Sequence, residues 1–333
     1  MASQKFILAG DIGGTKTSLA LYSLSSGKLK LVARETFPSK NYPGLEAVLK
    51  EFRADQTQPI LRACFGVAGP VIDGKVKTPN LPWVIRAGQV AKAFKLKTVS
   101  LLNDLEATAY GIFTLKQREI FTLNAGKGKR SGNKALIAAG TGLGEATLFD
   151  NGEECFPSAS EGGHGDFAPR NEIEVELLRY LIGKFGHVSY ERVVSGPGLW
   201  NIYEYLKQSG RLEESRWLTE KLAAAPDPSI VVTQLALAGE SAICERALEL
   251  FVSVYGAEAG NLALRAKATG GIYVGGGIAP KILAKLKDQT FMRAFTDKGR
   301  YGELLSAVPV RVILNEQTAL QGAAYYAAFR AHG

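Results

Sequence analysis

The sequence has few cysteines and no long apolar run, and both absences exclude classes of protein. Its three cysteines, Cys64, Cys155 and Cys244, lie far apart, with no Cys-x-x-Cys pair and no histidine at a zinc-binding spacing. We therefore expect reduced thiols and no zinc site. No uncharged apolar stretch reaches the ~18 residues that span a membrane, and the apolar segment near the N-terminus is too short for a signal-peptide core. These features predict a cytoplasmic protein that does not associate with a membrane.

The composition also lacks the features of disordered and nucleic-acid-binding chains. Hydrophobic residues make up 46% of the chain and charged residues 22%, as in folded domains. Lysine and arginine number 40 against 32 aspartates and glutamates, and the net charge of +8 favours an anionic ligand. The basic residues are scattered, however, without the aromatic interleaving or helix-turn-helix patterns of nucleic-acid readers. We expect no nucleic-acid partner.

Glycine is the residue in excess. The chain has 37 glycines in 333 residues, above the usual ~7%. Many of them gather in clusters at Gly10–Gly14, Gly140–Gly144, Gly162–Gly165 and Gly275–Gly277. Because glycine has no side chain, such segments can turn sharply or approach a ligand closely.

The order of apolar segments predicts an α/β chain with two similar halves. Strands are predicted at Phe6–Ala9, Ser18–Tyr22, Leu29–Ala33, Ile60–Val67, Val99–Leu102 and Ala135–Ala139, with a last helix at Thr318–Phe329. The strand at Val99–Leu102 runs into Asn103 and Asp104 and then into a helix. Both halves contain a strand, a glycine turn and a second strand, which suggests that they face one cleft.

The first glycine cluster fits two familiar phosphate-binding motifs poorly. A P-loop would need glycine where Thr15 stands, and a helix where a strand is predicted. Gly140–Gly144 has its third glycine one residue too early for a dinucleotide-binding turn. A β-hairpin clamp fits better, because backbone N–H groups and a threonine can hold phosphate beside an aspartate near Mg²⁺. An ordinary tight hairpin remains the alternative for each single turn.

Six motifs occur together in the order typical of one enzyme family. They are Gly10-Asp11-Ile12-Gly13-Gly14-Thr15, Leu102-Asn103-Asp104, Ala139-Gly140-Thr141-Gly142-Leu143-Gly144, Ser160-Glu161-Gly162-Gly163-His164, Glu191-Arg192-Val193-Val194-Ser195-Gly196-Pro197-Gly198 and Gly275-Gly276-Gly277-Ile278. Over nearly its whole length the chain resembles the bacterial-type glucokinases of the actin, Hsp70 and sugar kinase superfamily. The fourth and fifth motifs are the most specific part of the resemblance.

The resemblance implies a fold and a reaction. It implies two ribonuclease H-like α/β domains, as in actin-like ATPases, around a central cleft. The small domain would hold residues 1–114 plus 317–333, and the large domain residues 115–316. The implied activity is ATP- and Mg²⁺-dependent phosphorylation of D-glucose to D-glucose 6-phosphate in a homodimer. Closure of the domains on the sugar would exclude competing water.

The resemblance also assigns roles to residues on the sugar side. Asp104 is implied to be the catalytic base, since phosphoryl transfer needs a group that accepts the hydroxyl proton; the alternative is a plain N-cap of the following helix. The implied sugar-binding set is Asn103, Asp104, Glu161, His164 and Glu191, with Asn80 and Gly69 as weaker members. For Glu191 a surface charge is the alternative.

Three glycine turns supply the implied nucleotide-binding residues. These are Gly10, Asp11, Ile12, Gly13, Gly14, Thr15, Gly140, Thr141, Gly142, Gly275, Gly276 and Gly277. Asp11 is implied to hold Mg²⁺ through water, because Mg²⁺ keeps several waters and takes few carboxylates. The last turn is implied to lie on the adenosine side. Lys16 departs from the asparagine that often follows Gly-Gly-Thr in the family, which leaves the details of phosphate contact open.

Other functions remain open at this point. A kinase for mannose, fructose or an N-acetylated amino sugar would differ only in its pocket contacts, and the phosphoryl donor is ATP, ADP or polyphosphate. A sugar-sensing module on the same scaffold is a rival from another class, although a regulator would carry a DNA-binding segment and only nine residues precede Gly10. An actin- or Hsp70-like ATPase is the third rival, and the sugar-side residues disfavour it.

Overall fold

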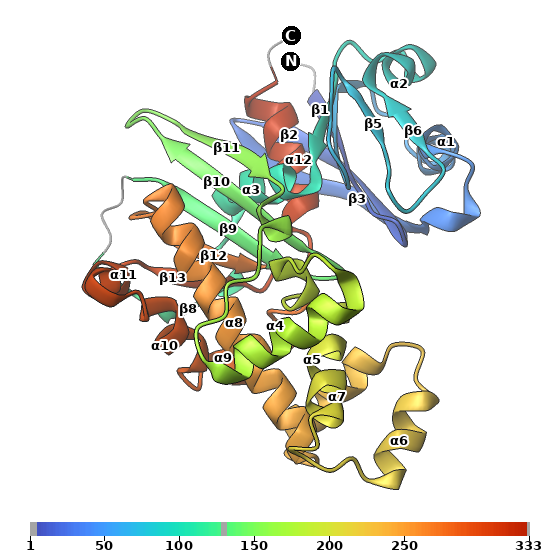
Figure 1. Ribbon diagram of the computed structural model, residues 1–333. Helices are drawn as coiled ribbons and strands as arrows, with labels where there is room; N and C mark the ends of the chain where they lie inside the picture. The colour runs from blue at the N-terminus through green and yellow to red at the C-terminus, as the bar shows by residue number, and fades with distance from the viewer. Residues whose placement is uncertain (1–4, 128–131, 332–333) are drawn as a thin grey trace. The chain divides into compact units, whose positions relative to one another are not determined.

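Two sheets organise the chain. The computed structural model describes residues 5–127 and 132–331 (Figure 1). The chain divides into two compact units: unit 1 consists of Met1–Lys116 and Asn315–Gly333, and unit 2 of Gln117–Leu314. Each unit contains one large sheet with helices, so the prediction of an α/β chain is confirmed.

The sheet of unit 1 has the strand order β3-β2-β1-β4-β7. The strands are β1 (Lys5–Ile12), β2 (Lys16–Ser25), β3 (Lys28–Pro38), β4 (Ile60–Val67) and β7 (Val99–Asn103). The first three pair as an antiparallel meander, while β4 and β7 run parallel to β1. A separate antiparallel pair is formed by β5 (Lys75–Lys77) and β6 (Val84–Arg86).

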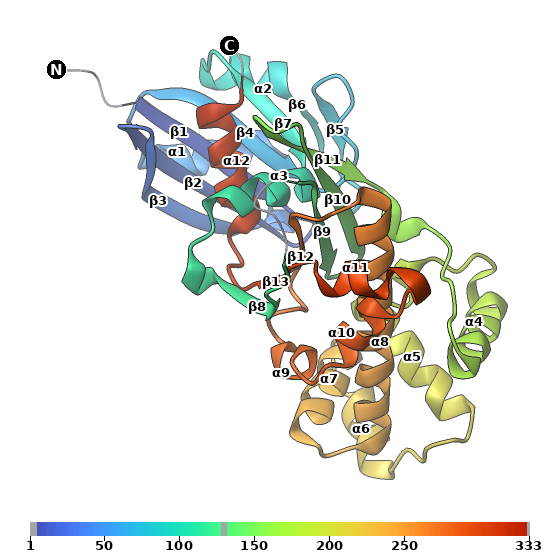
Figure 2. The ribbon, with the colours of Figure 1, turned by 90° about the vertical axis from the view of Figure 1, so that its left-hand side faces the viewer.

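Alternating apolar side chains give this sheet two buried faces. Leu8 and Phe65 pack in the cluster that contains residues of α1 (Leu45–Ala54) and α2 (Ala87–Phe94). Ile7 and Cys64 pack in a second cluster with α3 (Asp104–Gly111) and α12 (Thr318–Phe329). Figure 2 shows α12 lying across the strands of this sheet. Successive strand residues point to opposite faces, so helices on both sides explain why consecutive residues of the central strand β1 are buried.

The sheet of unit 2 repeats this order and adds one strand: β11-β10-β9-β12-β13-β8. The strands are β8 (Ile120–Asn124), β9 (Lys134–Ala139), β10 (Leu143–Asp150), β11 (Cys155–Ser160), β12 (Gly271–Gly275) and β13 (Val310–Ile313). Strands β9, β10 and β11 form an antiparallel meander, and β12 and β13 run parallel to β9. The first five strands in this order therefore have the same connectivity as the sheet of unit 1.

Helices make up the rest of unit 2. They are α4 (Glu172–Phe185), α5 (Gly196–Gln208), α6 (Arg216–Ala223), α7 (Pro228–Ala238), α8 (Ala242–Ala266), α9 (Leu283–Leu286), α10 (Thr290–Thr296) and α11 (Gly302–Ser306). The long helix α8 contributes Phe251 and Tyr255 to the largest core cluster, where they meet Ile137 of β9. Among the helices of the described residues, none is long and apolar enough to cross a membrane.

Candidate functional site

Two carboxylates lie at one edge of the unit 1 sheet. Strands β1, β4 and β7 are parallel, so their carboxyl ends meet at the same edge. Asp11 is the penultimate residue of β1, Asn103 is the last residue of β7, and Asp104 is the first residue of α3. Together these three residues form what we call the carboxylate edge.

The N-cap of α3 is Asn103, not Asp104. Asn103 Oδ1 accepts hydrogen bonds from the N–H groups of Leu105 (2.9 Å) and Glu106 (3.4 Å), and its Nδ2 donates to the carbonyl of Gly69 (3.2 Å). The alternative that Asp104 is a plain N-cap is therefore wrong. Gly69 has a φ of +107°, which favours glycine and places its carbonyl opposite Asn103. Asp104 lies in the first helical turn, where backbone N–H dipoles stabilise negative charge.

Asp11 is close enough to Asp104 for their charges to interact. Burial raises the pKa of Asp11 to about 6, and the negative charge of Asp104 adds to the rise, while Lys16 opposes it. Two carboxylates of this kind repel each other unless a cation or a proton lies between them. The carboxylate edge therefore favours binding of a divalent cation.

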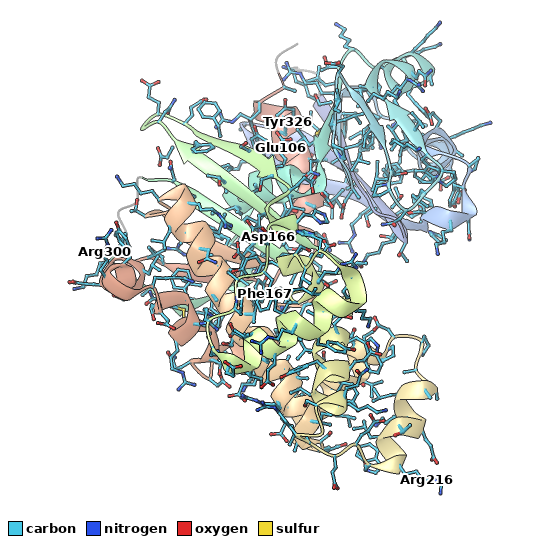
Figure 3. The ribbon with its side chains drawn as sticks, in the orientation of Figure 1. Glu106, Asp166, Phe167, Arg216, Arg300 and Tyr326 are labelled. Carbon is cyan, nitrogen blue, oxygen red and sulfur yellow. The ribbon has the colours of Figure 1, made fainter. Side chains whose placement is uncertain are left out.

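A third acid near this edge has a different environment. Burial raises the pKa of Glu106, which follows Asp104 by two residues in α3. Its charge acts on Tyr326 of α12 and on Tyr110, and Figure 3 labels Glu106 and Tyr326 near each other in unit 1. Glu106 thus belongs with the packing of α3 against α12, and we do not include it in the carboxylate edge.

The turn between β1 and β2 presents backbone donors. The N–H of Gly13 donates to the carbonyl of Lys16 (3.0 Å), which closes the turn. Within residues 5–127 and 132–331, no acceptor is found for the N–H groups of Gly14 and Thr15. Asn80 packs on this turn, because a Cβ on Gly14 would lie only 2.7 Å from the Cβ of Asn80. Two unpaired N–H groups beside Asp11 suit a phosphate group.

Two glycine turns lie side by side in unit 2. One follows β9, where the N–H of Gly140 donates to the carbonyl of Gly142 (2.8 Å). The other follows β12, where Gly276 has a φ of +82° and a Cβ would clash with the backbone of Ala139. The N–H of Ile278 donates to the carbonyl of Ala139 (3.2 Å) and joins the second turn to β9. Only glycine at position 276 permits this approach.

Glu191 is joined to the first of these turns. Its Oε2 accepts a hydrogen bond from the N–H of Leu143 (2.9 Å), and a side chain on Gly142 would clash with the Glu191 carboxylate. The alternative that Glu191 is only a surface charge is therefore wrong. A Cβ on Gly163 would clash with the carbonyl of Leu143, so the same residue also contacts the segment Glu161–His164.

The segment Glu161–His164 presents two exposed polar side chains. The side chains of Glu161 and His164 are 72% and 59% exposed, and His164 Nε2 lies 3.9 Å from Glu161 Oε2. Both are therefore accessible to a ligand. Leu143 contacts both this segment and Glu191. Unit 2 therefore brings the segment that carries Glu161 and His164 close to Glu191.

Comparison with known proteins identifies the family. The family model described as glucokinase matches residues 8–330. The chain is 41% identical to the glucokinase of Nostoc sp. over 337 residues, covering 97% of this chain and 98% of that protein. The glucokinase of Synechocystis sp. is also 41% identical, with 96% and 97% covered. This chain belongs to the glucokinase family. The family prediction is thereby confirmed.

Solved structures agree with this assignment. The glucokinase of an Antarctic psychrotroph superposes with a TM-score of 0.84 at 30% identity and covers 96% of this chain and 98% of its own. The glucokinase of Balamuthia mandrillaris shows the same fold at 21% identity, with a TM-score of 0.82 and coverages of 98% and 94%. The glucokinase fold therefore persists where the sequences have diverged widely.

The predicted site residues of this glucokinase-family chain fall into two groups. Unit 1 holds Asp11, Gly13, Gly14, Thr15, Gly69, Asn80, Asn103 and Asp104. Unit 2 holds Gly140, Thr141, Gly142, Glu161, His164, Glu191, Gly275, Gly276 and Gly277. Gly10 and Ile12 are buried in β1, where Phe65 occupies the space beside Gly10 and Ile12 packs in the core. Their side-chain positions face the core, so only their backbone remains for a ligand.

Sequence reasoning missed a tyrosine below the two glycine turns of unit 2. The hydroxyl of Tyr255 accepts from the N–H of Ala139 and lies 3.3 Å from the carbonyls of Ile137 and Gly275. Burial raises the pKa of Tyr255, so its hydroxyl stays neutral and can donate. It thus joins the ends of β9 and β12. No motif in the sequence marks this residue, which lies within an apolar helix.

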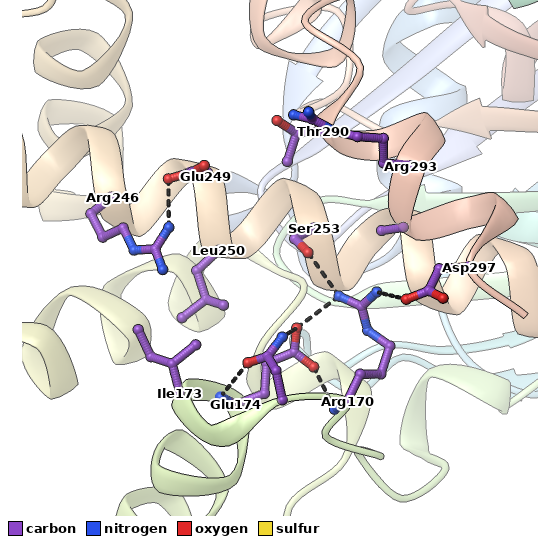
Figure 4. Close-up of a pocket in the computed structure, with 12 residues that line it drawn as sticks. Arg170, Ile173, Glu174, Arg246, Glu249, Leu250, Ser253, Thr290, Arg293 and Asp297 are labelled. Atoms are coloured by element: carbon purple, nitrogen blue, oxygen red, sulfur yellow. Dashed lines mark hydrogen bonds and ion pairs between the residues drawn. The ribbon is translucent and has the colours of Figure 1, made fainter.

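The glucokinase-family chain also has a charged pocket in unit 2 away from these turns. It has a volume of about 390 Å³ and lies between the start of α4, α8 and α10 (Figure 4). Its lining has equal numbers of arginines and carboxylates. Arg170 pairs with Glu174 and Arg246 with Glu249, both at 2.7 Å. Because these charges are balanced within the protein, we assign this pocket no ligand.

Proposed function

We propose that this chain transfers the γ-phosphoryl group of ATP to the 6-hydroxyl of glucose, forming glucose 6-phosphate and ADP. The observation that carries the proposal is the carboxylate edge of unit 1, with Asp11 and Asp104 beside a turn that has two unpaired N–H groups. Membership in the glucokinase family supports the choice of glucose. The same strand connectivity in both sheets supports two ribonuclease H-like cores.

Asp104 is the proposed general base. As the 6-hydroxyl oxygen of glucose attacks the γ-phosphorus, its proton passes to the Asp104 carboxylate. The bond between the γ-phosphorus and the bridging oxygen breaks, and the electron pair leaves with ADP. Catalysis of this kind rests on positioning and on neutralisation of charge. Asn103, by capping α3 and binding the Gly69 carbonyl, holds Asp104 at the start of the helix.

Asp11 is the proposed residue for Mg²⁺. Its carboxylate fits this role, because it is held beside a second carboxylate and its pKa is raised to about 6. When bound, Mg²⁺ supplies positive charge that offsets the phosphate oxygens. The N–H groups of Gly14 and Thr15 are proposed to bind the phosphates from the protein side.

Unit 2 is proposed to bind the sugar ring and the rest of the nucleotide. Glu161 and His164, on the segment Glu161–His164 that we call the sugar loop, and Glu191 offer acceptors and a ring nitrogen, which suit hydroxyl groups that donate and accept. Gly140, Thr141 and Gly142 are proposed to contact phosphate, and Gly275, Gly276 and Gly277 the adenosine. A homodimer remains a prediction that rests on the resemblance, and a cytoplasmic location remains a prediction that rests on the sequence.

Replacement of Asp104 tests the proposed function directly. Asp104→Asn removes the proton acceptor but keeps the shape, so we expect kcat to fall by about 10²–10⁴-fold while the glucose Kd stays within about tenfold. A coupled assay over several sugars and phosphoryl donors, with and without Mg²⁺, measures the rates. Asp55→Asn, an exposed acid at the end of α1, is the control and should keep full activity. Near-normal turnover of Asp104→Asn would remove Asp104 as the base, and a preferred sugar other than glucose would change the substrate.

A further inference from the structure

A buried glutamate lies directly beneath the sugar loop. Glu145 of β10 is 1% exposed and pairs across the sheet with Ser160, the last residue of β11. Its Oε2 occupies the space beside Gly162, so any side chain at position 162 would clash with it. The N–H of Gly162 donates to Ser160 Oγ, which in turn donates to the backbone carbonyl of Glu145. The loop therefore rests on Glu145 through both side-chain and backbone contacts.

A second buried glutamate contacts the same arginine as Glu145. Glu258 of α8 is fully buried, and Arg265 Nη2 donates to a carboxylate oxygen of each glutamate, at 3.0 Å for Glu145. Glu145 Oε1 is buried and has no hydrogen-bond partner within the described parts of the chain. One contacting arginine cannot compensate two buried negative charges, and an uncompensated buried charge is costly.

The same network reaches the segment that carries Glu191. Asn261 Nδ2 donates to Glu258 Oε2 (2.8 Å) and lies 3.0 Å from the hydroxyl of Tyr190. Tyr190 is buried and directly precedes Glu191. Glu145 and Glu258 therefore connect, through Arg265 and Asn261, the two segments on which the proposed sugar-binding side chains lie.

We propose that Glu145 is a positioning residue for the sugar loop and that glucose binding requires Glu145 in its neutral, protonated form. This inference rests on the proposed function, because it assigns the sugar to Glu161 and His164. Loss of the proton places a second negative charge beside Glu258 and against Gly162, and the loop must shift to relieve it.

The electrostatic surroundings agree with a proton held near neutral pH. Burial raises the pKa of Glu145 to about 8, the charge of Glu258 adds to the rise, and Arg265 opposes it. The ionisable groups around the pair are Glu258, Arg265 and Tyr255 of α8, Tyr190, Lys298 after α10, and Glu161 and His164 of the sugar loop itself. Lys298 acts on Glu258 but does not pair with it, and burial lowers the pKa of Lys298.

The test is the pH dependence of glucose binding. For the wild-type enzyme, we expect the glucose KM to rise about tenfold between pH 7 and pH 9, as a pKa near 8 implies, with a much smaller change in kcat. Glu145→Gln imitates the protonated acid, so its KM should match the wild type at pH 7 and stay flat to pH 9. Fluorescence titration with glucose in the absence of nucleotide gives the same comparison without turnover.

Two further variants sharpen the result. Arg265→Gln removes the cation that opposes the rise in pKa, so the increase in KM should begin at higher pH than in the wild type. Glu249→Gln, in the separate charged pocket, should follow the wild-type curve. If the wild-type KM stayed constant with pH, or if the KM of Glu145→Gln rose in parallel with that of the wild type, this inference would be overturned and the proposed function would stand. Absence of glucose phosphorylation at pH 7 would overturn the proposed function as well.

Discussion

At the scale of single residues, Asp11 combines a cost in stability with a proposed role in binding. Its folded-state pKa of about 6 lies above the ordinary value of 3.8, so the folded protein binds this proton more tightly than the unfolded chain. The resulting stabilisation is complete below about pH 3.8 and is lost as the pH rises through about 6. Above that pH the ionised carboxylate is held close to Asp104 at a cost that a bound cation would offset.

Asp11→Asn should therefore raise stability and abolish function together. We expect the variant to be more stable than the wild type at pH 8 by roughly 1–2 kcal/mol and to differ little at pH 4. Its Mg²⁺-dependent turnover should be lost at every pH, whereas in the wild type the Mg²⁺ concentration needed for half-maximal turnover should increase as the pH falls through about 6, because a proton on Asp11 competes with the cation. Thermal melting at both pH values, followed beside the activity profile, checks this; a variant less stable than the wild type at pH 8 would contradict it.

The motif residues could be found from sequence because they sit in short, ordered segments. Asp11 and Asn103 lie at the carboxyl ends of β1 and β7, and Asp104 begins the helix after β7, which is where a parallel sheet presents side chains to a ligand. Tyr255 and Glu145 could not be found in this way. Their importance comes from contacts with segments up to 120 residues distant in the chain, such as that between Glu145 and Arg265. The one local signal was a glutamate between the apolar residues Leu143 and Ala146 of β10.

At the scale of elements, long apolar segments were predicted well, and two short strands were missed. The strand Ile60–Val67 and the helix Thr318–Phe329 match β4 and α12 to the residue. Strands β8 and β13, of five and four residues, were missed. Strands of four or five residues are too short to show a clear alternation of apolar and polar residues. Pairing with neighbouring strands therefore decides their conformation.

Packing of α3 against α12 depends on two glycines. A Cβ on Gly322 of α12 would clash with the carbonyl of Ala107, and one on Gly111 of α3 would clash with the carbonyl of Thr318. The two helices thereby approach backbone to backbone, and the rings of Tyr110 and Tyr326 meet edge to face with centroids 5.0 Å apart. This contact fixes the helix that Asp104 begins.

Gly322→Ala should accordingly destabilise unit 1. The added methyl group forces α3 and α12 apart, and we expect a loss of about 2–3 kcal/mol together with a fall in kcat, because Asp104 moves with α3. Gly183→Ala in α4 is a matched control, since no atom lies near its Cβ position and alanine favours a helix by about 0.5–1 kcal/mol. Chemical denaturation and steady-state rates measure both. Equal stability changes in the two variants would contradict the packing argument.

At the scale of the whole molecule, the net charge is the property that acts on a ligand at the longest range. The basic residues behind the net charge of +8 are scattered along the sequence without a nucleic-acid-binding pattern, and a positive field raises the local concentration of an anion. ATP is highly charged and glucose is neutral. The two proposed substrates therefore respond differently to this field, and each serves as a control for the other in one enzyme.

The KM for ATP should increase with ionic strength while the KM for glucose stays nearly constant. The Debye length falls from about 30 Å at 0.01 M salt to about 8 Å at 0.15 M, which screens charges on the distant surface but spares contacts within the site. We expect the ATP KM to rise about threefold over this range and the glucose KM by less than about 1.5-fold. Initial rates at fixed free Mg²⁺ measure both constants. Parallel rises in the two constants would show that salt acts on the protein's conformation, and the long-range field would then have no part in nucleotide binding.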